Sequence, residues 1–581
     1  MRGKKNEVVL RDARRREWLI FREPHCVLQT AEPLEVMPLL REVAARVRAD
    51  GLFAAGFVAY EAAVGFDAAF RVHDPGAFPL IWFGLYPEPN CIPLEMQEGA
   101  EEGPVLGWRS AISLAQYRRA IRDIKGNIAA GRTYQVNYSL RLRAAFNDDG
   151  WCYFLRLVRA QEAPFGAYID TGRYAICCAS PELFFRLEAG HLESRPMKGT
   201  AARGLTWADD LAQSEWLRHS EKNRAENVMI VDMIRNDMGR VAQFGAVQVP
   251  QLFAVEKYPT VWQMTSTVTA RTEKSIPEVL QALFPCASIT GAPKHSTMRI
   301  IAELEQAPRR IYTGSIGYIA PDGKAQFNVA IRTVLVDRLS KIAEYGVGGG
   351  IVWDSTDVAE WEECATKARI LTQQAPRFQL LETMLWIRET GYGLLTLHLQ
   401  RLSRSADYFG FTLDMAAVCR RLQEAAGSFA TDATRVRLLL AKDGAISLEW
   451  APLARTSQVR ARRVCLAPVP IESSDPFLYH KTTNRLTYAR MLARCPEFDD
   501  VILWNERGEI TESCLANLVV ELDGERVTPP VSSGLLAGTY RQWMLDQGIV
   551  GERVIHKGEL AQCTGLWLIN SVRGEMSALL G

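Results

Sequence analysis

Apolar residues recur at helical spacing in three long stretches of the chain. Residues 113–130 have apolar positions three and four apart, with Ser113 as a candidate N-cap. Residues 221–238 carry apolar residues on one side, which predicts a second helix. Residues 360–371 form a third candidate helix, and the polar segment after it contains Pro376, which stops a helix.

A different pattern begins beyond that proline. Short strand-like runs alternate with helical stretches, the former at residues 435–441, 464–469, 500–504 and 518–522 and the latter at 399–409 and 482–494. We therefore predict a domain of residues 1–372, a linker of residues 373–379, and a second domain of residues 380–581.

Composition supports this division and excludes several classes of protein. A chain of 581 residues is too long for one hydrophobic core. Its net charge of +1 gives no sign of a nucleic-acid surface, and no apolar run has the length of a membrane span. The basic start lacks the apolar stretch of a signal peptide, and the 12 cysteines show no zinc-ligand spacing. We expect a cytoplasmic protein.

Lys198 is the most informative single residue. Pro196 restricts the backbone before it, and Gly199 allows unusual conformations after it. Such a setting can aim an amine at a substrate, although most lysines of this kind are solvated turn residues.

Polar fragments in the first domain gain meaning from their order. Alone, carboxylates three apart on a helix usually form a solvated face, and a run of glycines is usually a turn. In chain order the fragments are residues 180–182, 198–200, 225–227, 235–237, 288–294, 314–318, 328–333, 348–355 and 363–369. This order closely resembles the chorismate-utilising enzymes, which include anthranilate, isochorismate, salicylate and aminodeoxychorismate synthases. The resemblance covers about residues 110–372.

The resemblance implies an α+β fold with a two-sheet core around one buried site. It assigns Mg²⁺ to Glu226 and Glu363, with Glu360 assisting. The residues that it implies for binding chorismate, a dianion, are Arg332, Tyr318, Thr290, Gly348, Gly349 and Lys367.

Position 198 distinguishes branches of this family. Anthranilate synthases carry a small residue there, whereas the aminodeoxychorismate synthases carry lysine. In that branch the lysine attacks the ring and expels the 4-hydroxyl, and ammonia then displaces it at C4. Glu182 matches the family's general acid/base. One departure is Gln263, where the family often has histidine.

The second domain resembles the class IV pyridoxal-phosphate enzymes, which include aminotransferases and aminodeoxychorismate lyase. By this resemblance Lys481 binds the cofactor covalently and later acts as a base, and Glu512 pairs with the pyridine nitrogen. Arg401, Gly538 and Thr539 bind the phosphate. If its segment is extended, the neighbouring residue His480 points away from Lys481, which implies a structural role.

Together the two resemblances imply an enzyme that converts chorismate to 4-aminobenzoate in two steps. One alternative is an anthranilate or salicylate synthase fused to a class IV aminotransferase, and another is a catalytically dead half with a regulatory role. No segment resembles a glutamine amidotransferase, so we expect either a separate glutamine amidotransferase subunit that supplies ammonia or the use of free ammonium. A homodimer through the second domain is open, since class IV enzymes generally dimerise.

Overall fold

The computed structural model describes residues 4–94, 105–372, 376–453 and 460–581. Contacts divide the chain into two units. The first unit is Met1–Ala202 with Ser214–Ala375, and the second is Arg203–Gln213 with Pro376–Gly581. Of the expected linker at 373–379, residues 373–375 lie outside the described residues. The inclusion of residues 203–213 in the second unit is a finding that the sequence did not suggest.

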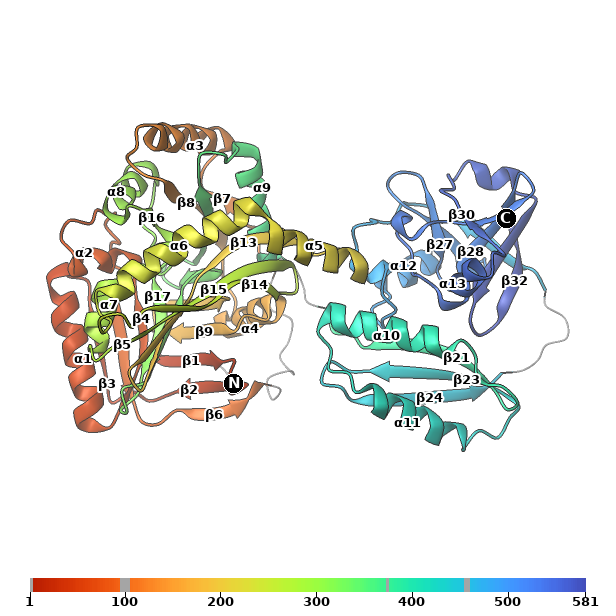
Figure 1. The fold of residues 1–581 in the computed structure, drawn as a ribbon, viewed down its shortest axis with the longest axis horizontal. Helices are drawn as coiled ribbons and strands as arrows, with labels where there is room; N and C mark the ends of the chain where they lie inside the picture. The colour runs from red at the N-terminus through yellow and green to blue at the C-terminus, as the bar shows by residue number, and fades with distance from the viewer. Residues whose placement is uncertain (1–3, 95–104, 373–375, 454–459) are drawn as a thin grey trace. The chain divides into compact units, whose positions relative to one another are not determined.

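The first unit contains two ten-stranded antiparallel sheets (Figure 1). One sheet follows the order β16 (Gly291–Ala292), β8 (Gln135–Ala145), β20 (Ile342–Ile351), β19 (Thr333–Asp337), β10 (Tyr174–Ser180), β9 (Phe165–Asp170), β1 (Glu7–Asp12), β2 (Glu17–Phe21) and β6 (Asn90–Pro93), with β7 (Arg109–Ser110) on β8. The other follows β13 (Met197–Ala202), β15 (Val261–Arg271), β12 (His191–Arg195), β11 (Leu183–Glu188), β18 (Ala325–Val329), β17 (Ser315–Ile319), β4 (Phe53–Val58), β5 (Ile81–Tyr86) and β3 (Cys26–Thr30), with β14 (Gln248–Lys257) on β15.

Buried side chains from both sheets share one apolar cluster. Phe21 of β2 lies 5.6 Å from Tyr86 of β5, measured between ring centroids. Burying a large apolar side chain contributes roughly 1.5–3 kcal/mol, so such contacts hold the sheets together. The expected two-sheet α+β core is confirmed.

Helices cover the outer faces of these sheets. They are α1 (Val36–Asp50), α2 (Ala63–Phe66), α3 (Leu114–Ala129), α4 (Gly150–Gln161), α6 (Glu221–Gly239), α7 (Ile276–Leu283), α8 (Lys294–Leu304) and α9 (Asp357–Ala368). The three predicted helices are confirmed as α3, α6 and α9. Ser113 caps α3, and it forms a capping box with Gln116. Helix α6 packs on β13 and β15, and α9 packs on β20.

The second unit contains two further sheets (Figure 1). The smaller follows the order β22 (Gly391–Tyr392), β21 (Leu380–Ile387), β23 (Ala433–Leu440) and β24 (Ile446–Pro452). The larger follows β27 (Ile510–Ser513), β26 (Asp500–Trp504), β25 (Arg462–Leu466), β32 (Gly574–Leu580), β31 (Gly565–Asn570), β28 (Asn517–Leu522), β29 (Glu525–Thr528) and β30 (Gly551–Glu552). Its helices include α10 (Leu395–Phe409), α11 (Met415–Ala426), α12 (Leu486–Arg494) and α13 (Thr539–Asp546). Helix α5 (Trp207–His219) begins within the segment that belongs to this unit.

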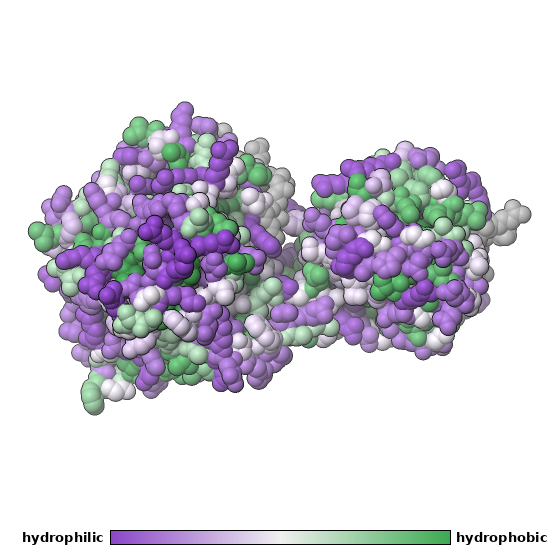
Figure 2. Space-filling view, turned by 90° about the horizontal axis from the view of Figure 1, so that it is seen from above, coloured by the Kyte–Doolittle hydropathy of each residue, from purple (hydrophilic) through white to green (hydrophobic). Residues whose placement is uncertain are grey.

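The face of the molecule in Figure 2 mixes hydrophilic residues with small hydrophobic patches. Within the described ranges, every helix is too short or too polar to cross a membrane.

Candidate active sites

Lys198 lies on β13 at an irregularity in the strand. Its pairing with β15 shifts in register between Met197 and Thr200, and Gly199 between them has a φ of 96°. A glycine accepts this conformation without strain, so the bulge turns the lysine out of the regular ladder. Its amine makes no hydrogen bond to a described residue, and it would lie 3.1 Å from a Cβ placed on Gly350.

Gln263 of β15 holds this bulge in place. Its amide nitrogen donates to the Gly199 carbonyl at 2.9 Å, and its oxygen accepts from the Thr200 hydroxyl at 3.1 Å. Asn227 of α6 donates to the Lys198 carbonyl at 3.3 Å. The residue that departs from the family pattern therefore holds the two residues that follow the lysine.

The surroundings of Lys198 favour its neutral form. Burial lowers the pKa of its amine, and the positive charge of Lys367 lowers it further. The carboxylates that oppose this shift are Glu226, Glu182 and Glu363. Three of the predicted metal or acid/base residues thus lie within electrostatic reach of the predicted nucleophile.

Glu182 is buried between β10 and β11. Burial raises the pKa of its carboxyl to about 7, while hydrogen bonding from Ser288 and the charge of Lys198 oppose the shift. The Ser288 hydroxyl donates to its Oε1 at 2.6 Å. A carboxyl with such a pKa can both hold and release a proton near neutral pH.

Helix α9 presents Glu363 and Lys367 to the glycines of β20. The Lys367 ammonium lies 2.6 Å from Glu363 Oε1 and donates to the Gly348 carbonyl at 2.8 Å. A Cβ on Gly349 would lie 2.9 Å from Glu360 Oε2. The glycine run is therefore a strand over which charged side chains converge, and not a turn.

Glu360 and Glu226 complete this acidic face. The Ser355 hydroxyl donates to Glu360 Oε1 at 2.7 Å, whereas its Oε2 is buried and has no hydrogen-bond partner. Burial raises the pKa of both carboxyls, and each is influenced by the charge of Glu363. In the described ranges, no three or more histidine, cysteine or acidic side chains lie close enough together to hold a metal ion as they stand.

Arg332 joins the group through the last turn of α9. Its backbone has a φ of 54°, and its Nη1 donates to the Lys367 carbonyl at 2.9 Å. Thr290 is fully buried, and its hydroxyl donates to the Cys286 carbonyl at 3.1 Å, while its own carbonyl accepts from the Asn137 amide. The hydroxyl of Thr290 is thus already engaged within its turn.

Tyr318 lies elsewhere. Its ring is buried between the sheets, 6.3 Å from that of Phe21, and the charged residues that influence it include Asp12 and Arg186. Neither Phe21 nor these charged residues belong to the group around Lys198, so the structure does not bring this predicted ligand to the site.

Tyr312, and not Tyr318, is the tyrosine that packs against the strand of the first site. Its ring lies against β20, where a Cβ on Gly346 would fall 2.2 Å from Tyr312 Cγ. Burial raises the pKa of Tyr345, and both Arg332 and Tyr312 act on it. Cys364 of α9 also influences Tyr312. The only sequence signal was the glycine at 346, which leaves room for this ring.

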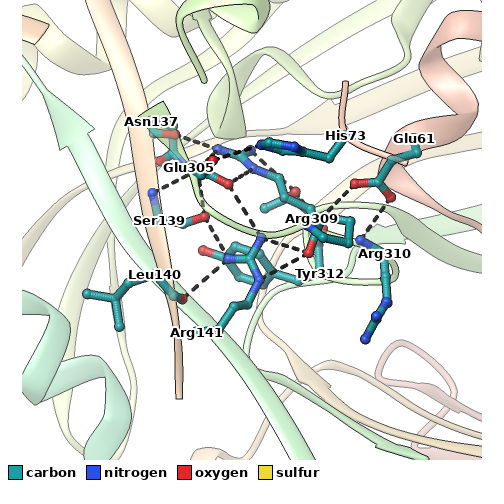
Figure 3. Close-up of polar contacts among 12 residues, drawn as sticks. Glu61, His73, Asn137, Ser139, Leu140, Arg141, Glu305, Arg309, Arg310 and Tyr312 are labelled. Carbon is teal, nitrogen blue, oxygen red and sulfur yellow. Dashed lines mark hydrogen bonds and ion pairs between the residues drawn. The ribbon is translucent and has the colours of Figure 1, made fainter. Parts of the chain in front are cut away.

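A buried charge network supports the floor of this site (Figure 3). Arg309 pairs with Glu305 at 2.6 Å and donates to the carbonyls of Asn137 at 2.6 Å and Ile289 at 2.9 Å. Glu305 also accepts from the Ser139 amide at 2.9 Å. One arginine therefore ties β8 to the turn that carries the predicted threonine.

The second site is built around Lys481. The preceding strand β21 holds this segment, because the Leu381 amide donates to the Lys481 carbonyl at 3.0 Å. The amine makes no hydrogen bond to a described residue. Burial, followed by the charge of Arg401, lowers its pKa to about 8.

Glu512 on β27 is one of the groups that influence this lysine. Its carboxylate accepts from the Tyr488 hydroxyl at 2.7 Å and from the Asn517 amide at 3.0 Å. Burial raises its pKa to about 7, against the hydrogen bonds from Tyr488 and from the Leu536 amide. An ordered carboxyl of this kind can face a ring nitrogen.

Arg401 and Gly538 form a candidate phosphate cradle. Arg401 pairs in two-pronged fashion with Glu382, at 2.8 and 2.6 Å, and donates to the Ala537 carbonyl. A Cβ on Gly538 would lie 1.8 Å from Asn517 Oδ1, so only glycine fits there. Helix α13 begins at the next residue and offers its free amides.

The sequence missed two supports of this cradle. His398 is fully buried, with its Nδ1 2.6 Å from Glu382 and its Nε2 3.3 Å from the Thr539 hydroxyl. The predicted structural role of His480 agrees with its position, since its ring packs against Tyr408 with centroids 4.2 Å apart.

Residues 5–373 match the chorismate binding enzyme family, and residues 379–579 match the class IV amino-transferases. The chain therefore belongs to the chorismate binding enzymes, and it carries a class IV amino-transferase domain after the chorismate-binding part.

Its relatives include aminodeoxychorismate synthase component 1 of Salmonella typhimurium, 44% identical over 267 residues, which is 45% of this chain and 58% of that protein. The corresponding protein of Bacillus subtilis is 39% identical over 43% of this chain and 54% of its own length. The chain thus spans little more than half the length of these relatives. The crystal structure of anthranilate synthase component I from Streptococcus pneumoniae superposes with a TM-score of 0.54 at 22% identity, over 64% of this chain and 94% of that chain, which supports the fold.

Proposed function

We propose that this chain makes 4-aminobenzoate from chorismate in two steps. The chorismate-binding part aminates chorismate at C4, and the class IV part eliminates pyruvate from the product. The observation that carries this proposal is Lys198. Its amine makes no hydrogen bond within the described ranges, and it lies among Glu182, Glu226 and Glu363 with a lowered pKa. A lysine there favours amination at C4 over the anthranilate alternative.

In the first step the neutral amine of Lys198 attacks the ring and the 4-hydroxyl leaves. Glu182, with a pKa near 7, donates a proton to the departing oxygen. Ammonia then forms a bond to C4, and the bond between the ring and the lysine nitrogen breaks, which returns Lys198 as the free amine. Substrate carboxylates are bound by Arg332, Lys367 and the backbone of β20, and Tyr312 replaces Tyr318 in this proposed set.

The acidic face suits Mg²⁺. Glu226, Glu363 and Glu360 would hold the ion, and the buried, unpartnered Oε2 of Glu360 supports this assignment. When bound, Mg²⁺ supplies positive charge that neutralises a substrate carboxylate.

The residues of the second site suit pyridoxal phosphate. Gly538, Thr539 and Arg401 would hold its phosphate, and Glu512 would face its ring nitrogen. When bound, the cofactor supplies an electron-accepting ring. Lys481, whose pKa is about 8, takes the C4 proton of the substrate, and loss of that proton allows pyruvate to leave.

The proposal includes a separate glutamine amidotransferase that supplies ammonia, because relatives carry the name component 1. It also includes a cytoplasmic location, consistent with the absence of disulfides among the described cysteines. A homodimer through the class IV domain completes the proposal.

The test supplies purified protein with chorismate, Mg²⁺ and ammonium and separates 2- from 4-aminobenzoate. Formation of 4-aminobenzoate is expected, and a 2-aminobenzoate product would overturn the C4 assignment. With glutamine in place of ammonium, the protein alone should form product far more slowly. Bound cofactor should give an absorbance band near the visible edge that Lys481→Ala removes.

A further inference from the structure

Residues 203–213 lie within the part of the chain that matches chorismate binding enzymes, yet their contacts are with the class IV domain. We call them the 203–213 segment. They contact the C-terminal end of α10 and the residues that precede Lys481. These contacts involve a buried ion pair, hydrogen bonds and cation–ring contacts, so the association is specific.

Arg203 is the centre of this association. Its guanidinium pairs with Asp210 at 2.6 and 2.8 Å, and the two side chains are only 8% and 2% exposed. The same guanidinium donates to the Tyr408 carbonyl at 2.7 Å and lies 4.5 Å from the centroid of the Tyr408 ring. Asp210 therefore orients Arg203, and Arg203 binds the C-terminal end of α10 through Tyr408.

Tyr408 contacts both the segment and His480. Its hydroxyl donates to the Gly204 carbonyl at 2.8 Å, and its ring packs against that of His480, whose Nδ1 lies 3.0 Å from the Ser405 hydroxyl. Leu205 packs with the apolar cluster that contains Leu478 and Tyr479. His480 is thus enclosed by the segment and by α10, and Lys481 is the next residue.

Trp207, in the middle of the segment, also contacts α10. The Trp207 indole donates to Asp407 at 2.7 Å, and Arg404 lies 5.5 Å from the centroid of the indole. Helix α10 carries Arg401 one turn earlier. The segment therefore touches both structural supports of the second site, namely helix α10 and the irregular run that leads to Lys481.

We propose that the 203–213 segment is a positioning element for Lys481, acting through Tyr408 and His480. This proposal rests on the proposed lyase function. It adds that a piece of the chorismate-binding sequence completes the lyase site, so the two activities share residues as well as a chain. Arg203 is a positioning residue, because it acts on Lys481 through Tyr408 and His480.

The experiment uses the full chain with Arg203→Met and Asp210→Leu combined, because removing one partner would leave a buried charge unpaired. The matched control is Arg388→Met with Asp432→Leu, an exposed ion pair of the same unit. The measurements are the Kd for pyridoxal phosphate, hydrogen exchange of residues 476–482, and each reaction step supplied with its own substrate.

We expect the Arg203 and Asp210 variant to bind pyridoxal phosphate about tenfold more weakly, the size of effect of one or two lost hydrogen bonds. Residues 476–482 should exchange faster, and the lyase kcat should fall while its KM stays within twofold. Amination of chorismate and all properties of the control should stay within twofold. Tyr408→Phe, which removes only the bond to Gly204, should change exchange in the same direction while the fold is retained.

Unchanged exchange and cofactor affinity in the combined variant would overturn the proposal. An equal loss of both reaction steps would also overturn it, because that result indicates general unfolding. Failure of the lyase function itself would appear differently, as wild-type protein that binds no pyridoxal phosphate. The exchange comparison would still report whether the segment orders residues 476–482.

Discussion

Each half of the chain contains a lysine with a lowered pKa whose amine makes no hydrogen bond to any residue that the structure describes, but the charges around the two lysines differ. Carboxylates and one lysine surround Lys198, whereas Arg401 and Arg485 approach Lys481 together with two glutamates. An acidic surrounding suits a metal ion that binds a dianion, and an arginine-rich one suits a phosphate. The charge of the neighbouring side chains therefore indicates the kind of ligand that each lysine meets, a metal-bound dianion at Lys198 and a phosphate-bearing cofactor at Lys481.

The two lysines also differ in how the backbone supports them. Lys198 lies on a strand bulge fixed by side chains of β15 and α6, which are regular elements of one unit. Lys481 lies in an irregular run between η6 (Pro476–Leu478) and α12. An irregular run has fewer ladder hydrogen bonds, so it depends more on packing against its neighbours.

The largest expected effect comes from removing each lysine separately. Lys198→Ala should lower amination at C4 by ~10³-fold or more and leave elimination of pyruvate from supplied 4-amino-4-deoxychorismate unchanged. Lys481→Ala should do the reverse. The measurement is product formation with each substrate in turn.

The same variants test whether the lysines act independently. Appearance of 2-aminobenzoate from Lys198→Ala would support its role in selecting C4. Unchanged formation of 4-aminobenzoate would remove that role, and loss of both steps in either variant would contradict independent sites.

The second prediction concerns the acid beside the first lysine. Glu182→Gln keeps the shape but cannot exchange a proton, so the kcat of amination should fall by ~10²-fold or more. The control is Glu188→Gln, an exposed carboxylate at the end of β11, the strand that follows Glu182. Equal kcat values of amination for the two variants would show that Glu182 has a structural role and transfers no proton.

The third prediction concerns pH and compares two carboxylates of the second unit. Burial raises the pKa of Glu512 from 4.5 to about 7. Stability from this group is complete below pH 4.5 and is lost as pH rises through about 7, a change of about 3 kcal/mol. Burial would also raise the pKa of Glu382, but Arg401 and His398 lower it to about 2. Its stabilising effect is present above pH 4.5 and is lost as pH falls toward 2.

Glu512→Gln should therefore flatten the pH dependence of unfolding between pH 5 and 8, and Glu382→Gln should flatten it between pH 4 and 2. The measurement is denaturant unfolding of cofactor-free protein across each range. Identical slopes for wild type and variant in its own window would contradict the corresponding assignment.

Much of the fold could be predicted from the sequence because its signals are local. Helices α3 and α6 follow apolar spacing and caps, and those signals lie within the segment that folds. The place of residues 203–213 could not be predicted, because Arg203 meets Tyr408 only after distant parts of the chain fold.

The candidate sites show the same limit. Chain order indicated both lysines and their acids, but it selected Tyr318, and the structure places Tyr312 against β20. Two tyrosines six residues apart look alike in a pattern, and only packing distinguishes the one that faces the site. The cradle residues His398 and Glu382 were missed because their pairing crosses from α10 to β21.

The smallest expected effect concerns Gln263, whose role the sequence could not decide. Its two hydrogen bonds hold the bulge around Lys198, and each contributes about 0.5–1.5 kcal/mol. Gln263→Ala should lower the kcat of amination by about tenfold and leave the lyase step unchanged, with Gln248→Ala, an exposed residue of β14, as control. Gln263→His should recover part of the loss if a ring nitrogen can donate to the Gly199 carbonyl. A Gln263→Ala variant with wild-type amination would mean that β13 keeps its bulge without this support, and Asn227 would then be the residue that orients Lys198.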